Sequence, residues 1–471
     1  MIRRTIGQLA AMCGAALNAA AENARDRLVT GVSRDSRQLP DGCLYVPLIG
    51  ARFDGHAYAE ECLRNGAAAS VWQLDRPIPD AIAEKPLLLV EDSLAALQQL
   101  ARSYRRELSA RIVGITGSNG KTTTKDLTAS TLAAAFSVHK TAGNLNNHIG
   151  LPLTILDIAE TTEFAVLEMG MSGFGEIELL TGIAEPDVAI ITNIGDAHMQ
   201  QLGSREGIAK AKLEIASGVK PGGLLLINGD EPLLTEGVSR LANIAELQVQ
   251  TFGLGEANDW SAGSIVIGAQ ESAFTVRPSG AAAKLAGAFK IPVPGKHNVS
   301  NALAVVALAS RSGMTAEQIR GGLSAVKLTS MRIETVQAYN GATILNDAFN
   351  ANPTAVRAAI DLVGELTGFG QRWIVLGDML ELGANEGRMH RETGELIGPE
   401  QADSVLTFGE RSRHTAEGAA VKLGTDKVIH FQTKEALAAY LKNHMQPNDL
   451  VLVKGSRGMR MEEIVQALQG S

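Results

Sequence analysis

The segment from Gly114 to Thr124, GITGSNGKTTT, has residue types and a spacing that can bind phosphate groups. An apolar run, residues 111–116, precedes its glycines, so the segment joins a predicted strand to a predicted helix. In such a loop, glycines let backbone N–H groups converge on phosphate oxygens, and the helix N-terminus favours an anion. The Lys121 ammonium would contact the β- and γ-phosphates, and the Thr122 hydroxyl would ligate Mg²⁺. We therefore expect an ATP site here.

The spacing departs from the strict GxxxxGK[ST] pattern, because Ile115 stands where that pattern has its first glycine. Gly117 and Gly120 are then the useful glycines. The alternative is a glycine-rich turn that binds no ligand, but a strand, glycines, a lysine and a threonine together favour phosphate binding. The expected ATP-binding residues of the loop are Thr116, Gly117, Ser118, Asn119, Gly120, Lys121, Thr122 and Thr123.

Two further reactive side chains follow later apolar runs. Glu168 ends the run 164–168, and His198 comes shortly after the run 188–193. Open α/β sheets bind ligands beyond the carboxyl ends of their strands, which is where both residues would lie. Taken alone, such a glutamate is usually a solvated rim residue, and such a histidine is more often a surface residue.

The elements that must position these residues fall into three segments. The chain has 471 residues, too many for one ordinary core. Short apolar runs alternating with helical periods indicate buried parallel strands in residues 87–322, and the same pattern returns in a smaller sheet over residues 323–471. Residues 1–86 differ, being rich in Arg, Asp and turn residues. The expected fold is α/β with three domains: 1–86, 87–322 and 323–471.

Composition excludes several classes of protein. The net charge of −8 does not fit a nucleic-acid binder. No apolar run reaches the length of a membrane span. The three cysteines form no CxxC pair, which argues against a zinc site or a disulfide framework and fits a reducing compartment. We expect a cytoplasmic monomer.

The form TGSNGKTT resembles the phosphate loop of the Mur ligases and the related folylpolyglutamate synthetases. The resemblance implies a small α/β N-terminal domain that binds a UDP-sugar, a central P-loop ATPase-like parallel sheet and a C-terminal Rossmann-like domain. It implies that Glu168 binds magnesium and that His198, in TNIGDAH, serves a second metal site, so that one or two Mg²⁺ ions bind. It further implies a carbamylated Lys212 as a metal ligand. Lys212 alone, between Lys210 and Glu214, is typical of a solvated helix face.

Other motifs extend the resemblance around the nucleotide. The run GKHNVSNA, residues 295–302, is similar to a family signature that places Asn298 near the adenine. Arg332 resembles the arginine that the third domain brings to the γ-phosphate, and Asp347 resembles a residue near the ribose. By this resemblance Lys121, His198, Lys212 and Arg332 are catalytic residues.

The two ends of the chain resemble one branch of the family, which uses ATP to add D-alanyl-D-alanine to a UDP-muramyl tripeptide through an acyl phosphate. The run NDAFNANP, residues 346–353, is similar to the DDSYNANP motif of that branch. The runs VLGDMLELG, KGSRGM, SRDSR and FDGH also match it, and no DNPR-type motif is present. The implied substrate-binding residues are Ser33, Asp35, Ser36, Asn350, Asn352, Lys454 and Arg457.

Some residues depart from the branch or have ordinary explanations. His148 stands where an acidic residue is expected, and Phe349 replaces the motif's tyrosine. Asp347 and Asn350 also suit a turn before Pro353. Serines and aspartates such as those of SRDSR can cap a helix, and the late basic residues can be solubilising charges. Three alternative functions remain: another amide ligase of this superfamily, a nucleotide-binding regulator without catalysis, and a small-molecule kinase.

Overall fold

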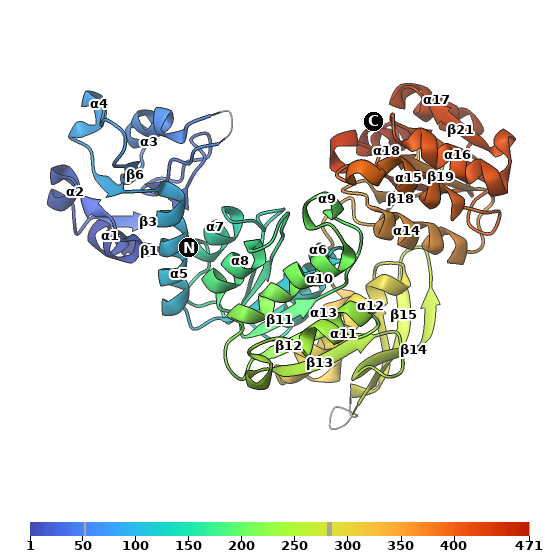
Figure 1. Ribbon diagram of the computed structural model, residues 1–471, viewed down its shortest axis with the longest axis horizontal. Coiled ribbons are helices and arrows are strands. Elements are labelled where there is room, and N and C mark those ends of the chain that lie inside the picture. The colour runs from blue at the N-terminus through green and yellow to red at the C-terminus, as the bar shows by residue number, and fades with distance from the viewer. Residues whose placement is uncertain (51–52, 280–284, 471) are drawn as a thin grey trace.

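The computed structural model describes residues 1–50, 53–279 and 285–470. Figure 1 shows three groups of elements along the chain, coloured blue, teal to yellow, and orange to red. Each group surrounds its own main sheet, and helices cover the sheets. The expected α/β class with three sheet-centred parts is confirmed.

The first sheet has the strand order β2-β7-β6-β5-β4, with β2 antiparallel and the others parallel. Its strands are β2 (Ala16–Leu17), β4 (Val32–Ser33), β5 (Leu44–Tyr45), β6 (Ala69–Gln73) and β7 (Leu87–Val90). Around it lie the helices α1 (Ile6–Cys13), α2 (Ala19–Asn23), α3 (Ala59–Arg64) and α4 (Asp80–Ala83), and β1 (Arg3–Thr5) pairs with β3 (Leu28–Thr30). Because β7 pairs with β6, the first sheet extends beyond residue 86.

Helix α5 (Ser93–Glu107) joins the first sheet to the central one. It begins at Asp92, whose side chain accepts a hydrogen bond from the Ala95 N–H at 2.7 Å. Its apolar side chains, including Leu97 and Tyr104, belong to one buried cluster shared by both parts. This junction is therefore a continuous hydrophobic core.

The central sheet has the order β16-β15-β14-β13-β12-β11-β8-β10-β9. Its strands are β8 (Arg111–Thr116), β9 (Val138–Lys140), β10 (Phe164–Glu168), β11 (Val188–Ile191), β12 (Leu224–Asn228), β13 (Gln248–Gly253), β14 (Trp260–Ile267), β15 (Ser272–Pro278) and β16 (Gly287–Ile291). The seven strands from β9 to β14 in this order are parallel, and β15 and β16 are antiparallel.

Strand β8 lies between β10 and β11, so the strand order reverses beside it. Ligands of open α/β sheets bind outside the carboxyl ends of the strands at such a point. The central strands are buried on both faces, which explains their continuous apolar sequences.

Two sets of helices cover the central sheet. One face is covered by α7 (Gly150–Leu156), α8 (Glu176–Ala184), α10 (Arg205–Leu213) and α11 (Pro232–Val238), and the other by α6 (Lys121–Ala133), α12 (Lys296–Arg311) and α13 (Ala316–Ser324). The short helix α9 (Met199–Leu202) follows β11. Leu323 of α13 is buried in the central core, so the expected boundary at residue 322 falls inside that helix.

The third sheet has the order β17-β18-β22-β19-β20-β21, with β17 antiparallel and the others parallel. Its strands are β17 (Glu334–Gln337), β18 (Thr343–Asp347), β19 (Arg372–Gly377), β20 (Ser404–Phe408), β21 (Val428–Phe431) and β22 (Leu450–Lys454). Its helices are α14 (Pro353–Glu365), α15 (Glu386–Glu395), α16 (Ser412–Leu423), α17 (Lys434–His444) and α18 (Glu462–Gln469).

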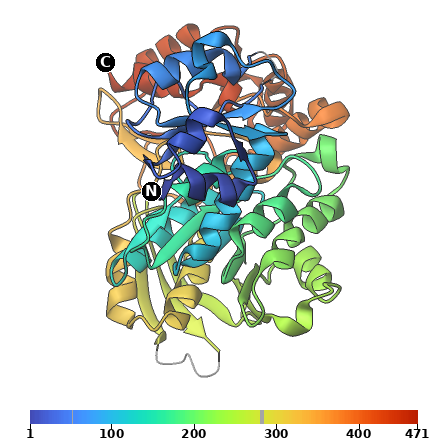
Figure 2. The ribbon, with the colours of Figure 1, turned by 90° about the vertical axis from the view of Figure 1, so that its left-hand side faces the viewer.

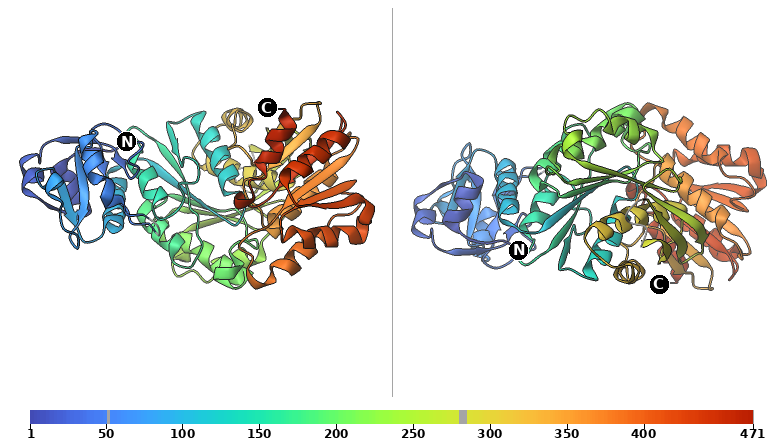
Figure 3. Two further views of the ribbon diagram at one scale, coloured as in Figure 1. Left: turned by 90° about the horizontal axis from the view of Figure 1, so that it is seen from above. Right: turned by 90° about the horizontal axis from the view of Figure 1, so that it is seen from below.

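The three parts lie in a row. In the side view of Figure 2 the three parts overlap. The views from above and below in Figure 3 show the central sheet between the other two. Within the described ranges, no helix is long and apolar enough to cross a membrane.

The third sheet contains a buried carboxylate whose removal tests its stability. Asp449 is 1% exposed and accepts hydrogen bonds from the Gln371 N–H (2.8 Å), the Trp373 indole N–H (3.0 Å) and the Gln446 N–H (2.9 Å). Asp449→Ala leaves these donors unpaired, so we expect a loss of about 2–4 kcal/mol of unfolding free energy. Calorimetry should show a lower melting temperature. The exposed Asp426→Ala is the control, and equal melting of both variants would contradict the expectation.

Candidate active site

The phosphate loop, residues 116–120, runs from the carboxyl end of β8 to the first residue of α6. Gly117 and Gly120 have φ values of 148° and 80°, which strain any residue with a side chain. A Cβ atom at Gly117 would lie 1.8 Å from the Thr192 Oγ1 atom. The two glycines singled out in the sequence are thus required by both conformation and space.

The residues that follow β11 hold this loop in place. The Ser118 N–H donates to the Asn193 carbonyl at 3.0 Å, and the Asn119 N–H donates to Asn193 Oδ1 at 2.9 Å. The Thr192 hydroxyl donates to the Asn119 carbonyl at 2.5 Å. These hydrogen bonds hold the loop in its curved form.

Lys121 turns its ammonium group back over the loop. Its Nζ atom donates to the Gly117 carbonyl at 2.7 Å and the Ser118 carbonyl at 3.3 Å. Burial lowers the pKa of Lys121, the Glu168 carboxylate opposes this, and the Arg332 guanidinium adds to it. Thr116, the first residue of the loop, is buried, and so are Thr122 and Thr123 at the start of α6.

Glu168 is 2% exposed at the carboxyl end of β10, next to β8 in the sheet. Its Oε1 atom accepts a hydrogen bond from the Asn146 side chain at 2.8 Å, and its Oε2 atom is buried without a partner. An unpaired carboxylate oxygen in the interior is costly unless a cation or a donor reaches it. The interpretation of Glu168 as a solvated rim residue is thus wrong.

His198 lies beyond the end of β11 in a left-handed conformation, with φ of 63°. Its Nδ1 atom is buried, has no hydrogen bond and lies 3.7 Å from the Glu381 carboxylate. Burial lowers the pKa of His198 to about 4, and the ammonium groups of Lys212 and Lys121 add to the effect. The imidazole is therefore neutral at pH 7, the form that binds metal ions.

Lys212 is 2% exposed on α10, whereas Lys210 on the same helix is exposed. The interpretation of Lys212 as part of a solvated helix face is therefore wrong. Burial lowers the pKa of Lys212 well below its usual value, and Lys121 adds to the shift. In the described parts of the chain, no carboxylate forms a salt bridge with it.

These residues fit a magnesium site in their chemistry. Glu168 supplies an unpaired carboxylate oxygen and Thr122 a hydroxyl, the hard oxygen ligands that Mg²⁺ prefers. Across residues 1–50, 53–279 and 285–470, no three His, Cys, Asp or Glu side chains gather as a metal-binding group. A full ligand set would therefore need groups beyond these types, such as Thr122, water, phosphate oxygens or a modified Lys212.

Arg332 reaches the phosphate loop from the segment between α13 and β17. Its Nη2 atom donates to Thr122 Oγ1 at 3.2 Å, and its guanidinium carbon lies 4.0 Å from the centre of the Phe349 ring. Its Nε atom is buried without a partner, and burial lowers the pKa of Arg332. Phe349, the departure from the motif's tyrosine, thus supplies a ring face for this arginine.

Asn298 lies buried in the first turn of α12. Its side-chain amide donates to the Pro294 carbonyl at 2.8 Å, and its oxygen accepts from the Asn301 amide at 3.4 Å. Asn301 in turn faces Gly120, where a Cβ atom would lie 2.8 Å from its side-chain nitrogen. Asn298 is thus linked to the phosphate loop through Asn301.

Asp347 and Lys454 are brought together at the ends of the parallel neighbours β18 and β22. The Lys454 ammonium donates to Asp347 Oδ2 at 2.5 Å and to the Asn350 carbonyl at 2.9 Å. Both side chains are buried. This ion pair fixes the turn 347–352 that leads into α14.

Asn352 caps α14, because its Oδ1 atom accepts the Ala355 N–H at 2.9 Å. Its side chain also pairs with that of Asn119 in the phosphate loop, at 2.8 and 3.4 Å. The exposed Asn350 and Arg457 line a small cavity of about 110 Å³ that also includes Asn352 and His198. The phosphate loop, His198 and the C-terminal motifs thus meet at one place.

The N-terminal candidates lie further away. Ser33 and Asp35 line a cavity of about 450 Å³, together with His139 and Lys140 of β9. A salt bridge from Arg37, at 2.8 Å, lowers the pKa of Asp35 to about 2. Ser36 does not line this cavity.

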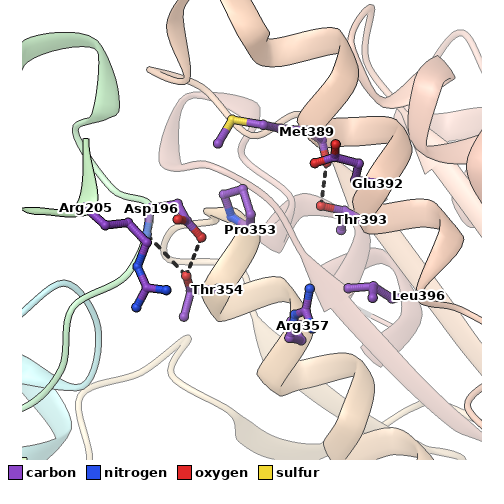
Figure 4. A pocket seen from close by; sticks show the side chains of 9 residues that line it. All are labelled: Asp196, Arg205, Pro353, Thr354, Arg357, Met389, Glu392, Thr393 and Leu396. Atoms are coloured by element: carbon purple, nitrogen blue, oxygen red, sulfur yellow. Dashed lines mark hydrogen bonds between the residues drawn. The ribbon is translucent and has the colours of Figure 1, made fainter. Parts of the chain in front are cut away.

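A larger cavity of about 480 Å³ lies where the central and third parts meet, and Figure 4 shows it. Asp196 and Arg205 line one side, and Thr354 of α14 lies between them and the α15 residues Glu392 and Thr393. The Asp196 N–H donates to Thr354 Oγ1 at 3.2 Å, and that hydroxyl donates to Asp196 Oδ2 at 2.7 Å.

Several residues that hold the site together were not predicted from the sequence. Asn193, Asp196 and Thr354 lie within or beside quoted motifs and Asn146 lies two residues before His148, but amide and hydroxyl groups that bind other protein groups have no distinctive spacing. Membership in a motif was the available signal. His148 is half-buried, and its carbonyl accepts a hydrogen bond from the Gln98 side chain of α5 at 3.0 Å.

Comparison with known proteins agrees with this architecture. Three family models match the chain: the Mur ligase family catalytic domain over residues 28–105, the Mur ligase middle domain over 115–309, and the Mur ligase glutamate ligase domain over 331–457. The UDP-N-acetylmuramoyl-tripeptide–D-alanyl-D-alanine ligase of Bacillus subtilis (strain 168) is 46% identical over 468 residues, covering 99% of each chain. The enzyme of that name from Escherichia coli (strain K12) is 35% identical and covers 100% of this chain and 99% of its own.

Solved structures are similar along the whole length. A crystal structure of MurF from Acinetobacter baumannii has a TM-score of 0.89 and 29% identity, covering 100% of both chains. MurF ligase from Thermotoga maritima in complex with ADP has a TM-score of 0.81 and 29% identity, covering 94% of this chain and 97% of that one. Since the three models together span most of the chain and relatives match it from end to end, the chain belongs to the Mur ligase family.

Proposed function

We propose that the chain is an ATP-dependent, ADP-forming ligase that joins D-alanyl-D-alanine to a UDP-N-acetylmuramoyl tripeptide and makes the pentapeptide precursor of peptidoglycan. The similarity to ligases of that name over the whole chain supports this function. The observation that carries it is the meeting of the phosphate loop, Glu168 and Arg332 at one sheet edge, next to the turn that contains Asn350 and Asn352.

The reaction has two steps. A terminal carboxylate oxygen of the tripeptide bonds to the γ-phosphorus of ATP, and the bond from that phosphorus to the β–γ bridging oxygen breaks. The products are an acyl phosphate and ADP. The amine of D-alanyl-D-alanine then attacks the acyl carbon and loses a proton, and inorganic phosphate leaves.

The first step brings a carboxylate against a triphosphate, so the site must neutralise negative charge. Lys121 and Arg332 both lie at the loop and both are partly desolvated, which strengthens their attraction for phosphate oxygens. Mg²⁺ held by Thr122 and Glu168, with His198 and Lys212 at a second ion, would add Lewis acidity. The protein's own share is to hold the loop and Arg332 in place before the substrates meet.

Lys212 suits carbamylation. A buried lysine with a lowered pKa holds more of its neutral amine, the form that attacks carbon dioxide. The new N–C bond gives a carbamate and releases one proton. The product is an anionic oxygen ligand in a place where the lysine has no carboxylate partner.

The other proposed roles concern the two substrates and the nucleoside. The cavity at Ser33 and Asp35 would take the UDP portion, and the cavity at His198 and Asn350 the dipeptide. Asn298 and Asp347 would lie near the nucleoside, where the central and third parts meet. Because ATP is the energy source, we propose a cytoplasmic enzyme, and a monomer since one chain supplies every residue named.

The first test is phosphate release from ATP and Mg²⁺ with UDP-muramyl tripeptide, with and without D-alanyl-D-alanine. We expect release to need both substrates and to yield UDP-muramyl pentapeptide, identified by mass spectrometry. Turnover with folate and glutamate, or with another acid and amine, would show that the substrates differ from those proposed and that the ligase chemistry is correct. Tight ATP binding without any turnover would indicate a regulator instead.

The carbamate at Lys212 predicts a rescue. Lys212→Ala should lower turnover by at least about 100-fold, because a metal ligand is lost. A short carboxylate such as formate or acetate should restore part of the activity by supplying the missing oxygen. Lys210→Ala, on the exposed side of the same helix, should stay within about twofold of the unchanged protein. Full activity of Lys212→Ala without added anion would end this proposal.

Arg332 should act on the transferring phosphate more than on ATP binding. We expect Arg332→Ala to lower kcat by about 10²–10³-fold, while the Kd for ATP changes by about threefold or less. Steady-state kinetics and equilibrium binding of ATP separate the two effects. A loss of affinity as large as the loss of kcat would mean that Arg332 binds the nucleotide in the ground state.

A further inference from the structure

The segment that carries Arg332 leaves the central core at α13 and enters the third sheet at β17, residues 325–333. It crosses α6, the helix that begins at the phosphate loop. Thr122 and Asp126 of α6 are four residues apart and so lie on one face of that helix. Thr122 accepts the hydrogen bond from Arg332, and Asp126 contacts the same segment three residues earlier.

Asp126 is 1% exposed and is fully engaged. Its Oδ2 atom accepts the Thr329 N–H and the Thr329 hydroxyl, both at 2.8 Å. Its Oδ1 atom accepts from the Lys140 ammonium at 2.6 Å and lies 3.7 Å from that of Lys125. Burial works to raise the pKa of Asp126, but the two ammonium groups and the Thr329 hydrogen bonds outweigh it and hold the pKa below its usual value. The carboxylate is therefore charged when it binds the segment.

The backbone next to Arg332 needs such an anchor. Met331 and Ile333, its two neighbours, have φ values of 61° and 53°. The left-handed region is unfavourable for residues with side chains, and most of all for a β-branched one such as Ile333. A strained conformation persists only where the surroundings fix it. On the far side, the Glu334 carboxylate accepts the Met331 N–H at 3.0 Å.

We propose that Asp126 and Thr329 are positioning residues, which clamp the strained segment onto α6 and so hold the Arg332 guanidinium over Thr122 at the phosphate loop. This inference rests on the proposed function for its kinetic consequence. It assigns a role to a carboxylate whose two oxygen atoms are both engaged by protein groups. Because Thr122 and Asp126 share one rigid helix, the distance between the anchor and the phosphate site is fixed by helix geometry.

A double-mutant cycle between Thr329 and Arg332 tests the inference. Thr329→Val removes the hydroxyl and keeps the shape and the backbone N–H. We expect kcat to fall about tenfold, with the Kd for ATP unchanged within about twofold. In the Arg332→Ala background the same change should cost nothing further, because the guanidinium that the anchor serves is gone. Thr329→Ser keeps the hydroxyl and should retain most of the activity.

Thr335→Val is the matched control. The Thr335 hydroxyl donates to the Ala269 carbonyl at 2.8 Å, so this variant loses another hydroxyl contact between the third part and the central sheet, but one that does not lead to the anchor. We expect Thr335→Val to lower kcat only slightly. In the double variant with Arg332→Ala, the two effects on kcat should multiply. If the effects of Thr329→Val and Arg332→Ala multiply instead, the positioning role is overturned.

A second measurement does not depend on turnover. Hydrogen–deuterium exchange of the nucleotide-free chain should become faster in residues 325–333 in Thr329→Val and stay unchanged in Thr335→Val. Equal exchange in all three proteins would overturn the anchor itself. If the wild-type protein did not turn over the two substrates, but the exchange difference between the variants were observed, the proposed function would be wrong and the anchor would stand.

Discussion

The whole site depends on an imbalance of charge. Lys121 and Arg332 are desolvated near the Glu168 carboxylate, one of whose oxygen atoms has no partner, and Lys212 is desolvated near Lys121. Burying cations without matched anions is costly, and the lowered pKa values of all three express that cost. In the proposed function, the triphosphate and the peptide carboxylate would supply the missing negative charge.

The fold holds these groups together from separate parts of the chain. Lys121 begins α6, the helix that follows β8, and Glu168 ends β10. His198 follows β11, and Lys212 lies on α10. The parallel order places the ends of β8, β10 and β11 side by side at one edge. Arg332 comes from the linking segment, whose path is set by α6 itself. The sheet topology thus positions most of the site, whereas Arg332 depends on the contact between Asp126 and Thr329.

The sequence predicted the α/β class, the glycines of the phosphate loop, the strand that ends at Glu168 and the strand that precedes His198, because these follow from local pattern and steric need. It did not predict that Lys212 is buried, since spacing alone made Lys212 part of a polar helix face. Burial of one lysine and exposure of another on the same helix depends on what packs against it. The pairing of Asp347 with Lys454, and of Asp126 with Thr329, joins residues more than 100 positions apart and could not be inferred from spacing. Nor could the left-handed residues beside Arg332, which carry no glycine to mark them.

The two junctions between the three parts differ in their balance of contacts, although Ile267 and Ala269 of the central part also pack against the core of the third part. The first sheet joins the central one through the apolar side of α5, and separating them would expose Leu97 and Tyr104 to water. The third part meets the phosphate loop and the end of β11 through hydrogen bonds, at Asn352 with Asn119 and at Thr354 with Asp196. Amides and hydroxyls exchange such partners for water at little net cost. The contacts between the third part and the phosphate loop can therefore be exchanged for water more readily than the apolar contacts of α5 can be broken.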